Sequence, residues 1–180
     1  MKQLALTFLL LISTSLFNVQ AAQPPVIDFE NLKQAHWSDE ELANAELITD
    51  FVQSIMNNHD FEYVMRTFNN SAYKQHNRNI PDTMKGLVGF LREFVSDYPE
   101  YSYDVKRISV DNNMAIFHSH ATLNREDRGD DSKGLNIVDI WRIEDGNIVE
   151  HWDSVQALDG FMRFYSLISG GDINNNNGVF

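Results

Sequence analysis

Residues 136–153 read NIVDIWRIEDGNIVEHWD, and this stretch decides the fold. Apolar and polar side chains alternate on both sides of Asp145-Gly146, which is the period of a β-strand. An Asp-Gly pair between two such runs is typical of a tight hairpin turn. The stretch therefore predicts two antiparallel strands, residues 135–144 and 147–156.

The same period of two extends toward the N-terminus. Residues 101–110 and 114–124 alternate in the same way, and Asp111-Asn112-Asn113 between them predicts a second tight turn. Residues 125–134 form a longer charged connection. We expect four strands in one antiparallel meander.

Helical periodicity precedes the strands. A capping box at Ser38–Glu41 begins an amphipathic helix, Asp60 caps a second one, and Pro81-Asp82 opens a third. Residues 161–168 predict a further short helix or strand. Helices followed by a run of strands indicate an α+β fold. We expect the helices to pack on one face of a curved, mainly antiparallel sheet, whose concave face encloses a cavity.

The chain ends differ in composition from this domain. Residues 1–22 combine Lys2, a short apolar run and a small-residue site, which predicts a signal peptide cleaved after Ala21 or Ala22. The mature protein is then periplasmic or secreted and has no membrane segment. We expect an irregular lead-in over 23–37, one domain over 38–168, and a disordered Asn-rich tail over 169–180.

Composition excludes several classes of function. The 180 residues carry a formal net charge of −12, so nucleic acid is a poor partner. Cysteine is absent, which rules out disulfides, thiol catalysis and thiolate metal ligands. Neither a Gly-rich phosphate loop, nor a dinucleotide fingerprint, nor a serine nucleophile elbow occurs. We expect no cofactor.

Ionisable residues stand in otherwise apolar rows of three predicted strands. His118 and His120 share one face of their strand, Asp139 aligns with apolar neighbours, and His151 aligns with Asp153. Buried ionisable groups are costly unless paired, so such groups often line functional pockets. Each of them taken alone is equally well explained as a hydrogen-bonded core side chain.

A metal site is an alternative use of the same residues. His118 and His120, together with Asp139, His151 or Asp153, could supply two imidazoles and one carboxylate. A His-x-His pair on a strand is weak evidence for a metal, and we predict none.

Several short motifs resemble the SnoaL-like family of the nuclear transport factor two superfamily. They are Tyr73-Lys-Gln-His76-Asn77, Gly86, His118-x-His120, Val138-Asp139-Ile-Trp-Arg and Asp145-Gly-Asn-Ile-Val-Glu-His-Trp-Asp153. The resemblance covers about residues 42–158 and implies a cone-shaped barrel of N-terminal helices packed on a strongly curved, mainly antiparallel sheet. It implies a cofactor-free aldol-type reaction in which Asp153 moves a proton, with His151 and Asp139 also catalytic. It further implies that the pocket is lined by His76, His118, His120, Tyr73 and Trp141.

Two hypotheses about function follow. The first is a metal-free acid/base enzyme, a cyclase, lyase or isomerase acting on a small carbonyl compound, with Asp153 as the base. The alternative is a small-molecule-binding module of the same fold without turnover. The resemblance also suggests a homodimer through the outer sheet face, to which Trp141 and Trp152 could contribute if they are exposed.

Overall fold

A computed structural model describes residues 24–169 and 173–179 of the chain. The predicted signal peptide lies outside the described residues. The elements, in chain order, are α1 (Phe29–Leu32), α2 (Asp39–Val52) with a π-helical extension (Gln53–Asn57), α3 (Phe61–Thr67), β1 (Lys74–Gln75), α4 (Thr83–Asp97), β2 (Ser102–Asp111), β3 (Met114–Thr122), β4 (Leu135–Glu144), β5 (Asn147–Ala157) and α5 (Gly160–Ser169), with a short 3-10 turn at Arg125–Asp127.

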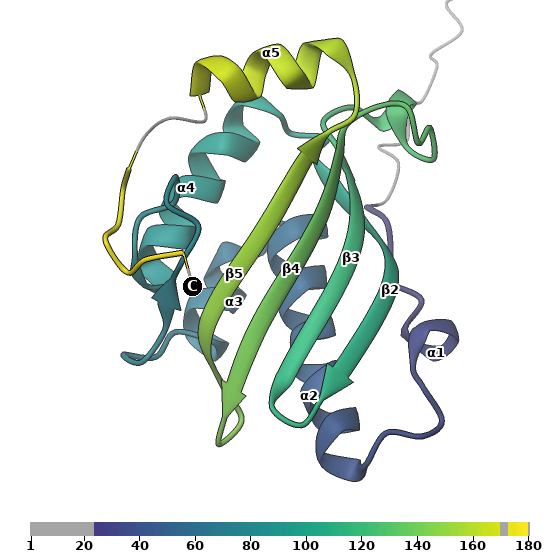
Figure 1. Ribbon diagram of the computed structural model, residues 1–180, viewed down its shortest axis with the longest axis vertical. Helices are drawn as coiled ribbons and strands as arrows, with labels where there is room; N and C mark the ends of the chain where they lie inside the picture. Colours follow the sequence, from purple (N-terminus) through teal and green to yellow (C-terminus); the bar gives the residue numbers. More distant parts are fainter. Residues whose placement is uncertain (1–23, 170–172, 180) are drawn as a thin grey trace, which may run out of the picture.

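The sheet has five strands in the order β1-β5-β4-β3-β2. Strands β2 to β5 form the predicted antiparallel meander (Figure 1). The two-residue strand β1 was not predicted. It runs parallel to β5 and places Gln75 opposite His151. This pairing brings the segment before α4 to the edge of the sheet beside β5.

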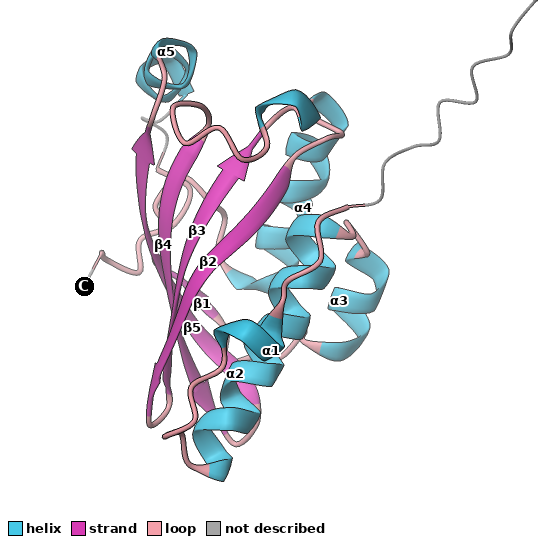
Figure 2. Cartoon of the chain, turned by 90° about the vertical axis from the view of Figure 1, so that its right-hand side faces the viewer, coloured by secondary structure: helices cyan, strands magenta, loops and turns pink. Residues whose placement is uncertain are grey.

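Helices α2, α3 and α4 cover one face of the sheet, and α5 lies across one end (Figures 1 and 2). The α+β class is thus as predicted. The sheet is not strongly curled, however, so the expected cone-shaped barrel is wrong in this respect. The edge strands β1 and β2 do not meet, and the helices rather than sheet closure cover the inner face.

Local sequence signals position the helices on that face. The capping box is formed, since Ser38 Oγ accepts from the Glu41 amide and Glu41 Oε2 accepts from the Ser38 amide at 2.8 Å. Phe51 of α2 then packs edge-on against Trp141 of β4, with 6.4 Å between ring centroids. Trp141 also meets Phe117 of β3 edge-on. These fully buried rings join the helical layer to the sheet.

Both ends of the described chain are more ordered than predicted. The lead-in contains α1, and its apolar side chains pack against the core. The tail, which was expected to be disordered, packs against the domain over residues 173–179, with Asn175 only 6% exposed. Among the described helices, none combines the length and the apolar character needed to cross a membrane.

Candidate active site

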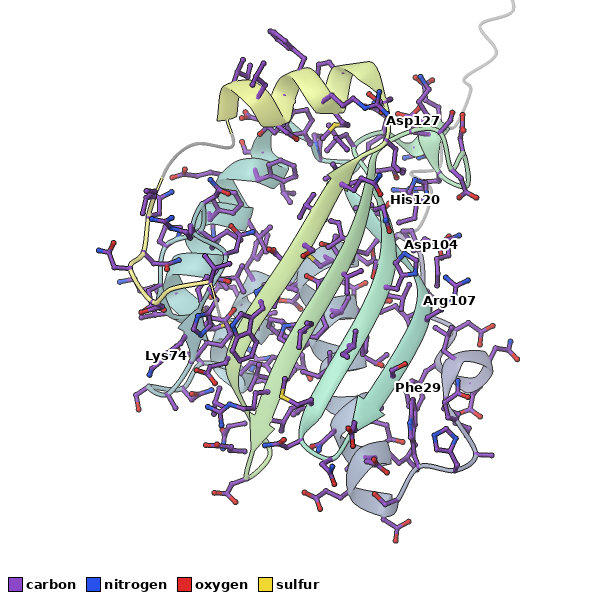
Figure 3. All side chains as sticks on the ribbon, viewed as in Figure 1. Phe29, Lys74, Asp104, Arg107, His120 and Asp127 are labelled. Atoms are coloured by element: carbon purple, nitrogen blue, oxygen red, sulfur yellow. The ribbon has the colours of Figure 1, made fainter. Side chains whose placement is uncertain are left out.

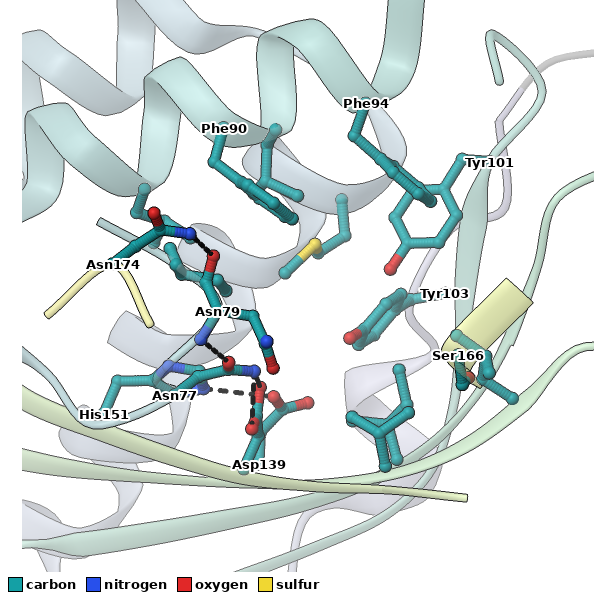
Figure 4. A pocket seen from close by; sticks show the side chains of 18 of the residues that line it. Asn77, Asn79, Phe90, Phe94, Tyr101, Tyr103, Asp139, His151, Ser166 and Asn174 are labelled. Atoms are coloured by element: carbon teal, nitrogen blue, oxygen red, sulfur yellow. Dashed lines mark hydrogen bonds and ion pairs between the residues drawn. The ribbon is translucent and has the colours of Figure 1, made fainter. Parts of the chain in front are cut away.

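A cavity of about 540 Å³ lies between the inner face of the sheet, α4 and α5. Most of its wall is apolar or aromatic, and a polar group stands at one end (Figure 4). The apolar wall includes Phe51, Met56, Ile80, Leu87, Phe90, Leu91, Phe94, Leu135, Ile137, Trp141, Val155 and Met162. The polar end is formed by Asn77, Asp139, His151 and Asp153.

Strand register brings the three ionisable groups together. Asp139 on β4 is directly paired with Asp153 on β5, and His151 lies two residues before Asp153 on the same face. One ligand-type atom of each residue lies within 4.8 Å of the others. The alternation predicted from the sequence therefore places Asp139, His151 and Asp153 in one cluster, with Trp141 beside it.

Hydrogen bonds fix the ring of His151 on both sides. Nδ1 lies 3.0 Å from Gln75 Oε1, and Nε2 lies 3.1 Å from Asp139 Oδ1. The backbone N–H of Asn77 donates to the same Gln75 atom, which is therefore the amide oxygen. Because an oxygen only accepts, His151 Nδ1 carries a proton and donates it to Gln75. Nε2 and the Asp139 carboxyl therefore share one proton, either as imidazolium with carboxylate or as imidazole with carboxylic acid.

Burial and charge act in opposite directions on this pair. Burial lowers the pKa of His151, but the hydrogen bond to Asp139 and the charges of Asp153 and Asp139 raise it by more. Burial raises the pKa of Asp139 above its usual value, although His151 opposes this. Both groups thus bind a proton more tightly than they do in water.

The two carboxylates of the site differ in their hydrogen bonds. The side-chain amide of Asn77, a residue outside the sheet, donates to both oxygens of Asp153, at 2.8 and 2.7 Å. Asp139 is 1% exposed, and among the described residues no donor reaches its Oδ2. A buried carboxylate oxygen without a partner costs about 1–3 kcal/mol, so this atom is a natural partner for a hydroxyl or enol of a ligand.

Two buried phenols that sequence reasoning missed lie toward the apolar end. Tyr101 and Tyr103 line the cavity, and their rings meet edge-on with 5.7 Å between centroids. Burial raises the pKa of both phenols, so they remain neutral donors. Tyr103 follows the alternation of its strand and could have been found that way. Tyr101 stands two residues earlier in the strand predicted over 101–110, so the same alternation could have found it, although β2 itself begins at Ser102.

His118 and His120 do not line the cavity, and the prediction that they do is wrong. Their strand presents Ala115, Phe117 and Ser119 to the core, so both histidines lie on the opposite face (Figure 3, in which His120 is labelled). His118 contacts Arg107 at 3.0 Å and Asn136 at 2.6 Å, and His120 Nε2 contacts the carbonyl of Lys133. Alternation was predicted correctly, but it does not say which face the helices cover.

His76 and Tyr73 are also outside the cavity wall, contrary to prediction. His76 stacks on Trp152 on the outer side of β5, with 4.6 Å between ring centroids, and contacts Glu150. Tyr73 is buried behind the cluster and accepts a hydrogen bond from Gln75. Sequence reasoning missed Gln75 and Asn77, because their role depends on the pairing of β1 with β5.

The structure separates the residues of the two-histidine metal site that the sequence left as an alternative. A site with two histidines would join His118 or His120 to Asp139, but these residues lie on opposite faces of the sheet. The group of described residues that could hold an ion consists of Asp139, His151 and Asp153. It offers one imidazole and two carboxylates, and the imidazole is hydrogen-bonded to one of those carboxylates.

Comparison with known proteins identifies the domain. The profile of the SnoaL-like domain matches residues 48–151, which is more than half of the chain. The chain belongs to the SnoaL-like family. No curated protein resembles this SnoaL-like chain closely enough to count as a match.

Solved structures share the fold of this SnoaL-like protein at low identity. A candidate SnoaL-like polyketide cyclase from Jannaschia sp. CCS1 matches with a TM-score of 0.57 and 12% identity, over 76% of this chain and 98% of that chain. A candidate polyketide cyclase from Bacillus cereus ATCC 10987 also gives 0.57, at 16% identity over 80% and 91%. AclR, a candidate hydroxylase from Streptomyces galilaeus, gives 0.54 at 15% identity over 72% and 97%. Such likeness shows the fold alone.

Proposed function

We propose that this SnoaL-like protein is a cofactor-free acid/base enzyme that enolises a small carbonyl compound, as a cyclase, lyase or isomerase does. The observation that carries the proposal is the unpartnered Oδ2 of Asp139 at the cavity. The same carboxyl group shares a proton with His151 through its other oxygen, Oδ1. Two ionisable groups in contrasting surroundings are the usual basis for separate acid and base roles.

Each group has a distinct part in the proposed step. Asp153 takes the proton from the carbon next to the carbonyl, and Asn77 keeps its carboxylate in place. The Asp139–His151 pair gives its proton to the carbonyl oxygen as the enolate forms, with the proton carried on the unpartnered Oδ2 of Asp139 as a carboxylic acid and His151 left as imidazole. One C–H bond breaks and one O–H bond forms, so the step needs no oxidant or metal. An isomerisation is completed when Asp153 gives its proton to another carbon and the O–H proton returns to Asp139.

The cavity wall supports a flat, largely apolar substrate. Phe90 and Phe94 of α4 face the cavity together with Tyr101 and Tyr103 (Figure 4). Aromatic walls favour rings by stacking or edge contacts. The phenols can donate to a second oxygen at the end away from Asp153, which would fix the orientation of the substrate.

Deuterium incorporation from heavy water tests the proposal without knowledge of the natural substrate. We expect the protein to accelerate exchange of the C–H protons next to the carbonyl in bicyclic aryl ketones such as 2-tetralone, followed by proton NMR. Asp153→Asn should lower the enzyme-dependent rate about 100-fold or more, because general base catalysis contributes about 10²–10⁴-fold. Asp104→Asn on β2, at an exposed ion pair with Lys106, is the matched control and should leave the rate unchanged.

The same assay separates the enzyme from the alternative, a binding module. The largely apolar cavity favours that alternative if ketones broaden in the NMR spectrum on binding while no exchange is accelerated. Acceleration that survives Asp153→Asn would contradict the assignment of the base. Ketones that neither bind nor exchange would contradict both functions.

Location and assembly are separate proposals. We propose that the protein is exported to the periplasm or secreted, and sequencing the N-terminus of the mature protein tests this.

We also propose a homodimer through the outer sheet face, to be tested by sedimentation. Trp141 cannot contribute to such a contact because it is 1% exposed on the inner face, whereas half-buried Trp152 lies on the outer face.

A further inference from the structure

The C-terminal tail, residues 173–179, binds residues 75–82, a loop that begins at the last residue of β1 and leads to α4. Both segments lie at the β5 edge of the sheet (Figure 1). The tail donates hydrogen bonds to five backbone carbonyls, which belong to Gln75, Asn77, Arg78, Asn79 and Ile80. The family profile matches residues 48–151, so the tail lies outside the matched residues.

Asparagine side chains make most of these bonds. Asn175 donates to the carbonyls of Asn77 at 2.8 Å and Ile80 at 2.9 Å, and Asn177 donates to that of Gln75 at 2.9 Å. Asn174 donates to the carbonyl of Asn79 at 2.6 Å and also lines the cavity. An amide group satisfies two carbonyls at once, which explains why asparagine serves here better than an apolar residue.

The loop that receives these bonds carries the two residues that orient the acid/base groups. Gln75 holds His151 Nδ1 at 3.0 Å, and Asn77 holds both oxygens of Asp153. The carbonyl of each is bonded by the tail. A chain of contacts therefore leads from the tail through one loop residue to each catalytic side chain.

We propose that Asn175 and Asn177 are positioning residues of the acid/base site, and that they act through Asn77 and Gln75 to fix Asp153 and His151. This inference rests on the proposed function for its catalytic meaning, but its structural content can be measured without turnover. Loss of the tail contacts should let the loop move and loosen the ring of His151, since small misplacements of catalytic groups have large effects.

The test compares isosteric variants in the full-length protein. Asn175→Asp replaces the donating amide by a carboxylate that faces two carbonyl oxygens. Asn176→Asp adds the same charge at the neighbouring exposed position and is the matched control. Nitrogen NMR of histidine-labelled protein from pH 5 to 9 reports the tautomer and pKa of His151, assigned with His151→Gln.

We expect Asn175→Asp to shift the midpoint of the His151 titration by about half a pH unit or more, and Asn176→Asp to leave it in place. Deuterium exchange should slow about tenfold, mainly in kcat, only in the first variant. Should Asn175→Asp fail to fold, Asn177→Ala removes the contact with Gln75 more gently and should shift the same titration. An unchanged His151 titration in a folded Asn175→Asp or Asn177→Ala variant would overturn the inference.

The two proposals fail in different ways. A His151 shift in Asn175→Asp, with no exchange activity in the unmodified protein, would keep the positioning role and overturn the enzymatic function. Exchange activity and a His151 titration that are both indifferent to Asn175→Asp would keep the function and overturn the role of the tail.

Discussion

The two faces of the sheet carry similar residues but different environments. The inner face has Asp139, His151 and Asp153 beneath the helices, and the outer face has His118, His120 and Arg107. Inside, each bond is between buried or half-buried groups, and one carboxylate oxygen has no donor. Outside, the His118 contact with Arg107 is exposed, although His120 is buried and its Nδ1 has no partner among the described residues. Coverage by helices, rather than residue type, separates a candidate active site from a polar surface.

The largest expected difference between the faces is in stability. Replacing His151 by Ala leaves Asp139 buried without its partner, and we expect the free energy of unfolding to fall by about 3 kcal/mol. Replacing His118 by Ala removes an exposed contact with Arg107 and a partly buried one with Asn136 but leaves no buried charge without a partner, and should cost about 1 kcal/mol. Urea unfolding at pH 7 measures both. Equal losses would mean that the two faces are energetically alike.

The second prediction concerns pH. The folded pKa of His151 is raised, so its stabilisation is complete below about pH 6.5, the value for unfolded histidine, and is lost as pH rises through the folded pKa. The pKa of Asp139 is also raised in the folded protein, so its contribution to stability likewise falls as pH rises, starting from the lower pKa of an unfolded aspartate. The stability advantage of the unmodified protein over Asp139→Asn should therefore be larger at pH 6 than at pH 9, by about 1 kcal/mol.

This comparison between variants is needed because other groups titrate too. Burial lowers the pKa of His59, whose effect on stability has the opposite sign but is common to both proteins. A pH-independent difference for Asp139→Asn would contradict the shared proton.

A third, smaller effect is expected at the apolar end of the inner face. Tyr103→Phe removes one hydroxyl of the buried phenol pair while keeping the ring, and we expect deuterium exchange to slow about tenfold, the scale of one lost hydrogen bond. Tyr98→Phe, at the rim of the aromatic group beside Phe94, should leave the rate unchanged. Equal rates for both variants would remove the phenols from the orientation of the substrate.

The smallest effect should come from the outer histidines. The double variant His118→Gln with His120→Gln should change the exchange rate by less than about twofold, because these side chains lie across the sheet from the cavity. A loss as large as that of Asp153→Asn would mean that the outer face takes part in the reaction, and would break the comparison between the faces.

Sequence by itself determined helices α2, α3 and α4, the four long strands and which residues share a face of each strand. Period-two alternation set which residues of β3, β4 and β5 lie together, and so it joined Asp139 with Trp141 and His151 with Asp153. The Asp145-Gly146 turn pairs Glu144 with Asn147 and Ile143 with Ile148, as a tight hairpin turn dictates. A one-residue register shift between Ile143 and Arg142 then pairs Asp139 with Asp153, and the local sequence signals did not predict this shift.

Only the tertiary structure decided which face is covered and what holds the cluster. Alternation is symmetric between the two faces, so it could not place His118 and His120 outside. Gln75 reaches His151 through the pairing of a two-residue strand, and Asn77 reaches Asp153 across 76 positions of the chain. The tail owes its order to carbonyls about 100 residues away. Such contacts depend on the packed arrangement of distant segments, for which the local sequence contains no periodic signal.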